Sequence, residues 1–423
     1  MSQFARSISL VDTPAAIVLV SAVTICALIA ALGFFDPEKR SRTSWTLIIS
    51  LALTAVVWLV LEKIWRPFPD PVPLRVYLAS AASAFVVLSA LVVRGWRIRL
   101  ILPAVLSIAA AWGCANLVYQ QYPTLASLHP APQAVRMDYQ EFQKLSLPPT
   151  IDGEAAGALV RIPATGEVSG FKARDAVAYV PPAYWTKPEL RLPVLVLMAG
   201  NPGQPMQWFS NGQGEITADN YQAQHDGIAP VIVSVDATGS LTANPLCIDG
   251  PEDQVQTYLS RDVPELIHQH FPRINPDQRS WTIGGLSYGG TCALQVVTNS
   301  PRAYGSFLNF SGQAEPTIGS HKETLDRFFG GSEQAFEAIN PATILSRAAA
   351  DKDQRFRGIA GRFVAGERDQ SSGEALAKLN DLTQQVGMRT EFTTVPGAHS
   401  YEVWRVALRE NLDWVVRRGG INP

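Results

Sequence analysis

The 423-residue chain is poor in charge: Asp, Glu, Lys and Arg make up only 17% of it, whereas 47% of its residues are hydrophobic. An ordinary soluble protein carries about 25% charged residues. The net charge of −2 gives no basic surface for nucleic acid. The chain also lacks zinc-ligand spacings, a glycine-rich phosphate loop, internal repeats and low-complexity tracts. We therefore expect neither a metal ion nor a nucleic-acid partner, and the apolar excess needs another explanation.

That excess is concentrated in the first quarter of the chain. Four apolar runs without a charged residue or histidine cover about 14–35, 45–61, 76–93 and 100–118. Each is roughly 17–22 residues long, which lets a helix cross a hydrocarbon core of ~30 Å. One such run could be a buried core helix or, for the first, a signal peptide, but four in succession favour a membrane region. Without charge inside the runs, transport is poorly supported, and we interpret the bundle as an anchor among membrane lipids.

Lysine and arginine predict the orientation of this bundle, since cytoplasmic loops carry an excess of them. The first and third loops hold six of these residues, against four in the middle loop and at the N-terminus: Lys39, Arg40, Arg42, Arg94, Arg97 and Arg99, against Arg6, Lys63, Arg66 and Arg75. Both chain ends then lie outside the cytoplasm. We expect a multi-pass protein of the cell membrane with an extracytoplasmic C-terminal domain.

The rest of the chain divides into a linker and one large domain. Residues 1–120 form the membrane region, and five prolines among polar residues predict a semi-stiff linker over 121–155. From about residue 157, short apolar runs alternate with amphipathic ones. Strands are expected at 158–162, 176–180, 193–198, 230–235, 280–284, 306–310, 361–364 and 390–394, and helices at 254–271, 288–299, 372–386 and 401–417. This alternation predicts an α/β domain over 156–423, with a doubly wound, mostly parallel sheet covered on both faces.

One stretch inside this domain predicts chemistry. Gly285-Leu286-Ser287-Tyr288-Gly289-Gly290 follows an expected strand and precedes an expected helix. Strand, Gly-x-Ser-x-Gly, helix is the nucleophile elbow of the α/β-hydrolases. The turn is so sharp that side chains at Gly285 and Gly289 would collide with their neighbours. It lifts the Ser287 hydroxyl to the carboxyl edge of the sheet, where sites form in such folds.

The expected partners of Ser287 come later in the chain, because α/β-hydrolases order their residues as serine, acid, histidine. His399 stands just after the last expected strand and is our predicted base. The loop after the preceding strand holds two carboxylates, Glu367 and Asp369. Either could orient the imidazole; we choose Asp369, deeper in the loop, and keep Glu367 as the alternative.

Two backbone donors and a cysteine pair complete the predicted site. An oxyanion hole in this fold takes one N–H from the residue after the nucleophile, here Tyr288, and one from the loop after an early strand. In Ala199-Gly200-Asn201-Pro202-Gly203 we choose Asn201, because proline has no N–H. Cys247 and Cys292 both fall in this domain, and outside the cytoplasm they could form a disulfide; two buried thiols are the alternative.

Several of these segments together resemble a known family. They are Ala178-Tyr179-Val180-Pro181-Pro182-Ala183-Tyr184, Gly200-Asn201-Pro202-Gly203 with Trp208, the elbow, and Gly397-Ala398-His399-Ser400-Tyr401-Glu402-Val403-Trp404-Arg405. Over roughly residues 155–418 the chain resembles the putative esterase family, which includes esterase D, enterochelin esterases and the antigen 85 mycolyltransferases. The resemblance implies an α/β-hydrolase fold, no cofactor and a triad of Ser287, Asp369 and His399. The four apolar runs depart from the secreted antigen 85 proteins, and anchored members of this layout look most like those of actinobacteria.

We therefore expect a membrane-anchored serine esterase that hydrolyses acyl or lipid esters. One alternative is acyl transfer to a sugar or lipid hydroxyl of the cell envelope, for which the same triad serves. Another is a non-catalytic envelope-binding protein that kept the fold. The acyl chain, the alcohol and the oligomeric state are not predicted. A cap over the site is expected within 312–347, on position and length alone.

Overall fold

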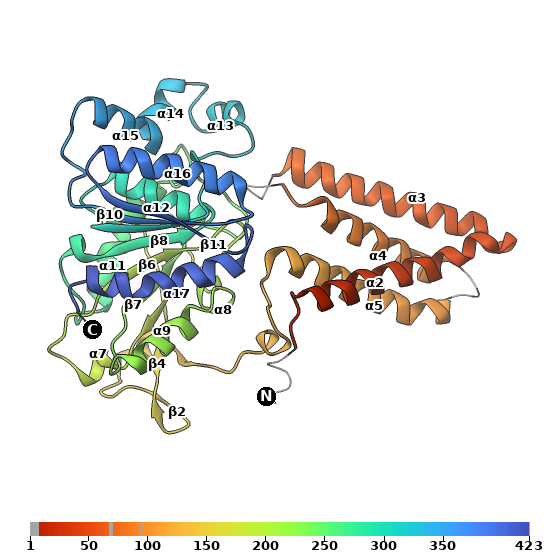
Figure 1. The fold of residues 1–423 in the computed structure, drawn as a ribbon, viewed down its shortest axis with the longest axis horizontal. Coiled ribbons are helices and arrows are strands. Elements are labelled where there is room, and N and C mark those ends of the chain that lie inside the picture. The colour runs from red at the N-terminus through yellow and green to blue at the C-terminus, as the bar shows by residue number, and fades with distance from the viewer. Residues whose placement is uncertain (1–7, 67–70, 94, 96, 423) are drawn as a thin grey trace. The chain divides into compact units, whose positions relative to one another are not determined.

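The structure is a computed structural model that describes residues 8–66, 71–93, 95 and 97–422. Arg6 and Arg94, which enter the prediction of orientation, lie outside the described residues. The chain forms two compact units, Met1–Ala131 and Pro132–Pro423. Figure 1 shows the first as a set of long helices and the second as a sheet between helices.

Four helices of the first unit are long and apolar enough to cross a membrane. They are α2 (Thr13–Ala31, continued by the 3₁₀ turn Leu32–Phe35), α3 (Pro37–Leu59, continued by the π turn Val60–Ile64), α4 (Leu74–Val92) and α5 (Arg97–Tyr119). Helix α3 begins eight residues before the predicted run, because Asp36 caps it by accepting a hydrogen bond from the Glu38 N–H and Pro37 suits its first turn. Lys39, Arg40 and Arg42 therefore lie in a helix and not in a loop.

The second unit begins before the predicted domain start at residue 156. Strand β1 (Ala134–Asp138) pairs in parallel with β4 (Gly157–Ile162), and the helix α6 (Tyr139–Gln143) follows β1. A small hairpin, β2 (Thr150–Ile151) and β3 (Glu154–Ala155), comes next. The stretch 121–155 is thus not a linker throughout. The sequence gives only a weak pattern for β1 because this edge strand is half buried.

A sheet of nine strands forms the centre of this unit, in the order β1-β4-β5-β7-β6-β8-β9-β10-β11. All eight predicted strands are present: β4 (Gly157–Ile162), β5 (Ala176–Val180), β6 (Val194–Met198), β7 (Val231–Val235), β8 (Thr282–Leu286), β9 (Ser306–Phe310), β10 (Ala360–Gly366) and β11 (Arg389–Val395). Only the β4–β5 and β5–β7 pairs are antiparallel. The mostly parallel, doubly wound sheet is confirmed.

Helices cover both faces of the sheet. One hydrophobic core lies under α11 (Val263–His270), α12 (Tyr288–Asn299), α15 (Pro341–Ala350) and α16 (Gln370–Gln385), and the other lies under α8 (Gln207–Ser210), α9 (Gly214–Gln224) and α17 (Tyr401–Arg418). Figure 1 shows α12 and α16 on one side of the strands and α9 and α17 on the other. Successive residues of one strand feed different cores: Phe307 enters the first and Leu308 the second.

Two predicted segments differ in detail. The helix expected over 254–271 is broken into α10 (Val255–Thr257), a π turn (Tyr258–Asp262) and α11. The expected cap region contains α13 (His321–Phe328), α14 (Glu333–Ile339) and most of α15. Its beginning is tied to the elbow helix, since the Gln313 N–H donates to Thr291 Oγ1 at 2.9 Å.

Candidate active site

Ser287 lies at the junction of β8 and α12, in the strained conformation expected of an elbow. Its φ is +52°, a region that non-glycine residues rarely adopt. A Cβ on Gly285 would lie 2.4 Å from the carbonyl carbon of Gly289, and one on Gly289 would lie 2.3 Å from the Met198 oxygen. Both atoms belong to the backbone, so the turn closes only with glycine at these positions. The Ser287 N–H donates to the Phe310 oxygen at 2.7 Å, which holds the turn against β9.

His399 and Asp369 meet Ser287 at the same edge of the sheet. Because β8, β10 and β11 run parallel, the loops after their carboxyl ends converge. His399 Nε2 lies 2.9 Å from Ser287 Oγ, and His399 Nδ1 lies 2.8 Å from Asp369 Oδ2. Both distances are those of hydrogen bonds. The three residues are 82 and 30 positions apart in sequence order, yet their side chains form one continuous row.

The surroundings of Asp369 favour the ionised form of its carboxyl. Its side chain is buried, with the residue 8% exposed, and it also caps α16 by accepting from the Ser372 N–H. Burial alone would raise the pKa of this carboxyl, but the hydrogen bond and charge of His399 outweigh it and lower the pKa below its ordinary 3.8. Glu367 is exposed, and Asp369 is the carboxylate that contacts His399.

The loop after β6 passes directly beside the serine. A Cβ on Gly200 would lie 3.5 Å from the Ser287 Cβ. Asn201, next along this loop, is buried, and its Nδ2 donates to the Ala243 oxygen at 2.8 Å. Tyr288 is the first residue of α12, so its N–H has no acceptor within the helix. The backbone N–H groups of Tyr288 and Asn201 are therefore on the two segments that flank Ser287.

Arg174 braces the same loop, and sequence reasoning missed it. Its guanidinium donates to the Gly203 oxygen at 2.9 Å and to both carboxylate oxygens of Asp236, at 2.7 and 2.9 Å. Burial would raise the pKa of Asp236, but these bonds from Arg174 hold it below its usual range. Asp236 follows β7 immediately, a position at the carboxyl edge that could have drawn notice. No pattern in the sequence marks Arg174.

Trp404 is a second missed neighbour. Its ring lies edge-to-face with the His399 ring, with 5.2 Å between centroids and 88° between planes. It stands one turn into α17, five residues after His399. In the sequence, the segment 397–405, which contains Trp404, points only to a resemblance to the putative esterase family. The contact packs the imidazole against an aromatic ring.

Two further predictions concern the cysteine pair and the absence of a metal site. Cys247 and Cys292 form a disulfide, with 5.5 Å between Cα atoms. Among the described residues, no group of three or more His, Cys, Asp or Glu side chains could hold a metal ion.

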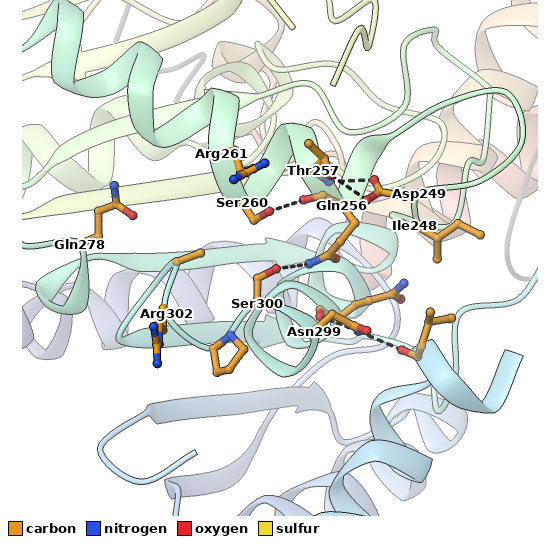
Figure 2. A pocket seen from close by; sticks show the side chains of 14 residues that line it. Ile248, Asp249, Gln256, Thr257, Ser260, Arg261, Gln278, Asn299, Ser300 and Arg302 are labelled. Atoms are coloured by element: carbon orange, nitrogen blue, oxygen red, sulfur yellow. Dashed lines mark hydrogen bonds between the residues drawn. The ribbon is translucent and has the colours of Figure 1, made fainter. Parts of the chain in front are cut away.

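A cavity of about 670 Å³ lies along α12 and the π turn, and its lining includes Gln256, Arg261 and Arg302 (Figure 2) but none of Ser287, Asp369 and His399.

Comparisons with known proteins show the family and the fold of the chain. The sequence profile of the putative esterase family matches residues 172–415. An uncharacterized protein of Corynebacterium glutamicum is 51% identical over 422 residues, 98% of this chain and 99% of its own. A solved ferulic acid esterase superposes with a TM-score of 0.53 at 19% identity, over 62% of this chain and 99% of its own. S-Formylglutathione hydrolase from Agrobacterium tumefaciens gives 0.51 at 18%, over 64% and 97%. The two structures confirm the α/β-hydrolase fold.

Proposed function

This chain belongs to the putative esterase family of serine hydrolases, and we propose that it is a membrane-anchored esterase whose Ser287, His399 and Asp369 act as a catalytic triad. The observation that carries the proposal is the hydrogen-bonded row from Ser287 Oγ through His399 to Asp369. A nucleophile, a base within hydrogen-bond reach and a carboxylate that orients the base are the parts that acyl transfer requires.

The proposed reaction starts on the ester carbonyl. Ser287 Oγ attacks the carbonyl carbon while His399 Nε2 takes its proton, and Asp369 keeps the Nδ1–H of the imidazole in place and stabilises the imidazolium. The N–H groups of Tyr288 and Asn201 bind the oxyanion. His399 then gives its proton to the leaving alcohol, and an acyl-serine remains. Water, deprotonated by His399, attacks this acyl group, the bond from the acyl carbon to Ser287 Oγ breaks, and His399 returns the proton to Ser287 Oγ as the acid leaves.

The acyl acceptor decides between esterase and acyltransferase. A sugar or lipid hydroxyl that replaces water in the second half of the reaction would convert hydrolysis into transfer with the same three residues. We propose hydrolysis, since it needs no second binding site. Incubation of the enzyme and an acyl ester with trehalose or a glycerolipid tests this, because hydrolysis predicts free acid as the main product with either acceptor present.

We further propose that residues 1–120 anchor the enzyme in the cell membrane, with the second unit, Pro132–Pro423, on the outer side. Four long apolar helices and the distribution of lysine and arginine support this placement. The relative from Corynebacterium glutamicum aligns over both units. A cysteine-reactive, membrane-impermeant reagent on intact cells that carry a single exposed cysteine near residue 420 would test the outward orientation; labelling only after lysis would contradict it.

Fluorophosphonate labelling of membranes that contain the full chain tests the triad. We expect the wild type to be labelled and Ser287→Ala not to be. Ser346→Ala is the matched control, because Ser346 is exposed and its hydroxyl bonds only its own helix, at the Ala342 oxygen. Labelling of Ser287→Ala would show that another serine reacts. No labelling of folded wild type would favour the non-catalytic binding protein.

A further inference from the structure

The segment 237–247, which follows β7, is attached at both ends to one side chain of the elbow helix. Tyr288 Oη donates to the Ala237 oxygen at 3.0 Å and accepts from the Cys247 N–H at 3.2 Å. Tyr288 is 3% exposed, so water does not replace these bonds when they are lost. The side chain next to the nucleophile thus closes the segment into a loop, which we call the buttress loop.

Three residues on one face of α12 hold the end of the buttress loop. Tyr288, Cys292 and Gln295 are four and three residues apart, a spacing that aligns side chains along a helix. Each contacts Cys247: Tyr288 through its hydroxyl, Cys292 through the disulfide, and Gln295 Nε2 through the Cys247 oxygen at 3.3 Å. Leu246 and Cys247 have φ of +58° and +53°. Such strained backbone persists only where its surroundings over-determine it.

The middle of the buttress loop holds the segment that carries an oxyanion donor. The Leu241 oxygen accepts from the Gly203 N–H at 3.0 Å, and the Ala243 oxygen accepts from Asn201 Nδ2 at 2.8 Å. A continuous set of bonds therefore runs from the side chain of Tyr288 to Asn201. It joins the two segments that flank Ser287 by a second route, in addition to the pairing of β6 with β8.

We propose that the Tyr288 hydroxyl is a positioning residue that sets, through the buttress loop, where the Asn201 N–H meets the oxyanion. The inference rests on the proposed function, since it concerns an oxyanion hole. Donors stabilise the oxyanion only within about 2.7–3.1 Å, and a displacement of about 1 Å costs on the order of 100-fold in rate. Since the oxyanion develops only as the carbonyl is attacked and is absent from the bound substrate, the loss falls on kcat and leaves KM nearly unchanged.

The test compares Tyr288→Phe with Tyr304→Phe in the full-length protein, with p-nitrophenyl butyrate as substrate. Tyr304 is the matched control: it is equally buried, and its hydroxyl donates to one backbone oxygen, that of Leu259, at 2.8 Å. Tyr288→Phe loses two buried hydrogen bonds and Tyr304→Phe loses one, and both variants lose some thermal stability. We expect Tyr288→Phe alone to lower kcat, by about tenfold, as a partial displacement of one donor would. Equal kcat in the two variants would overturn the proposal.

A second pair of variants asks whether the effect passes through Asn201. In an Asn201→Ala background the direct bond from residue 201 to Ala243 is already absent and the Gly203–Leu241 bond remains, so adding Tyr288→Phe should lower kcat by less than tenfold. An undiminished loss there would contradict the proposed route. An inactive, unlabelled wild type would overturn the proposed function and this inference together, whereas an active wild type with an unaffected Tyr288→Phe overturns the inference alone.

Discussion

Gly289→Ala is the sharpest test of how closely the elbow is packed against the loop after β6. The new Cβ would lie 2.3 Å from the Met198 oxygen and 2.7 Å from the Ala199 oxygen, where ordinary contact begins near 3.4 Å. The shortfall is about 1 Å, and both neighbours are backbone atoms that cannot rotate away. The Met198 oxygen also accepts from Trp208 Nε1 at 2.8 Å, which fixes it further.

The strain must therefore separate the start of α12 from the strand end that leads to Gly200 and Asn201. A misplacement of about 1 Å lowers kcat/KM by on the order of 100-fold, or about 2.7 kcal/mol of transition-state stabilisation. Overpacking of this kind also costs about 1–3 kcal/mol of stability. Hydrolysis of p-nitrophenyl butyrate and thermal unfolding measure the two effects on the same preparation.

Gly373→Ala is the control for Gly289→Ala. Gly373 lies in α16, and a Cβ there would meet no atom within 4 Å. Alanine at this position should raise stability by about 0.5–1 kcal/mol and leave kcat/KM unchanged. If Gly289→Ala kept the stability and activity of the wild type, the close approach of the two backbones, and with it the proposed arrangement of the oxyanion hole, would be refuted.

Three further outcomes follow from the contacts described. Asp369→Asn should lower kcat by about 10⁴-fold while thermal unfolding stays within a few degrees, because the imidazole loses its orienting anion; a loss below tenfold in a kinetic assay would remove Asp369 from the triad. Replacing both Cys247 and Cys292 by alanine opens a link between residues 45 positions apart, which should cost about 4 kcal/mol and lower the Tm by about 10 °C; an unchanged Tm would contradict this. His321, between two glutamates of the cap region, has its pKa raised above 6.5 chiefly by its hydrogen bond to Glu333. Its contribution to stability is thus complete below pH 6.5 and fades as the pH rises through the folded-state value. His321→Ala should lower the Tm more at pH 5.5 than at pH 9, and equal shifts would refute the link.

Local sequence determined those parts of the molecule that depend on short-range rules. Short apolar runs that alternate with amphipathic ones predicted all eight principal strands of the α/β domain. The Gly-x-Ser-x-Gly spacing predicted the elbow, because only glycine fits where the backbones touch. The chain order of serine, acid and histidine then led to His399 and to a choice of two carboxylates. Four long apolar runs predicted the helices of the first unit.

The predictions that failed concern features for which the local sequence gives only a weak signal. Residues 134–138 form an edge strand whose half-buried side chains give a weak pattern, so the linker was drawn too long. The helix over 254–271 is interrupted by a π turn just before Pro264, which lies in the first turn of α11 and was not weighed as a helix boundary. Because α3 begins directly after its N-cap Asp36, three basic residues that were expected in a loop lie in this helix. The cap was missed because capping preferences are weaker signals than hydrophobicity.

Only the tertiary structure decided which distant groups meet. Whether Asp369 or Glu367 faces His399 depends on how the loop after β10 turns into α16, and burial with a hydrogen bond selects Asp369. The sequence holds no sign that Arg174 braces Gly203, or that the Tyr288 hydroxyl closes a loop which ends at Cys247. These contacts join segments that are tens of residues apart, and they form because the carboxyl ends of the parallel strands and the start of the antiparallel strand β5 lie at one edge of the sheet. Spacing along the chain carries no information about that meeting.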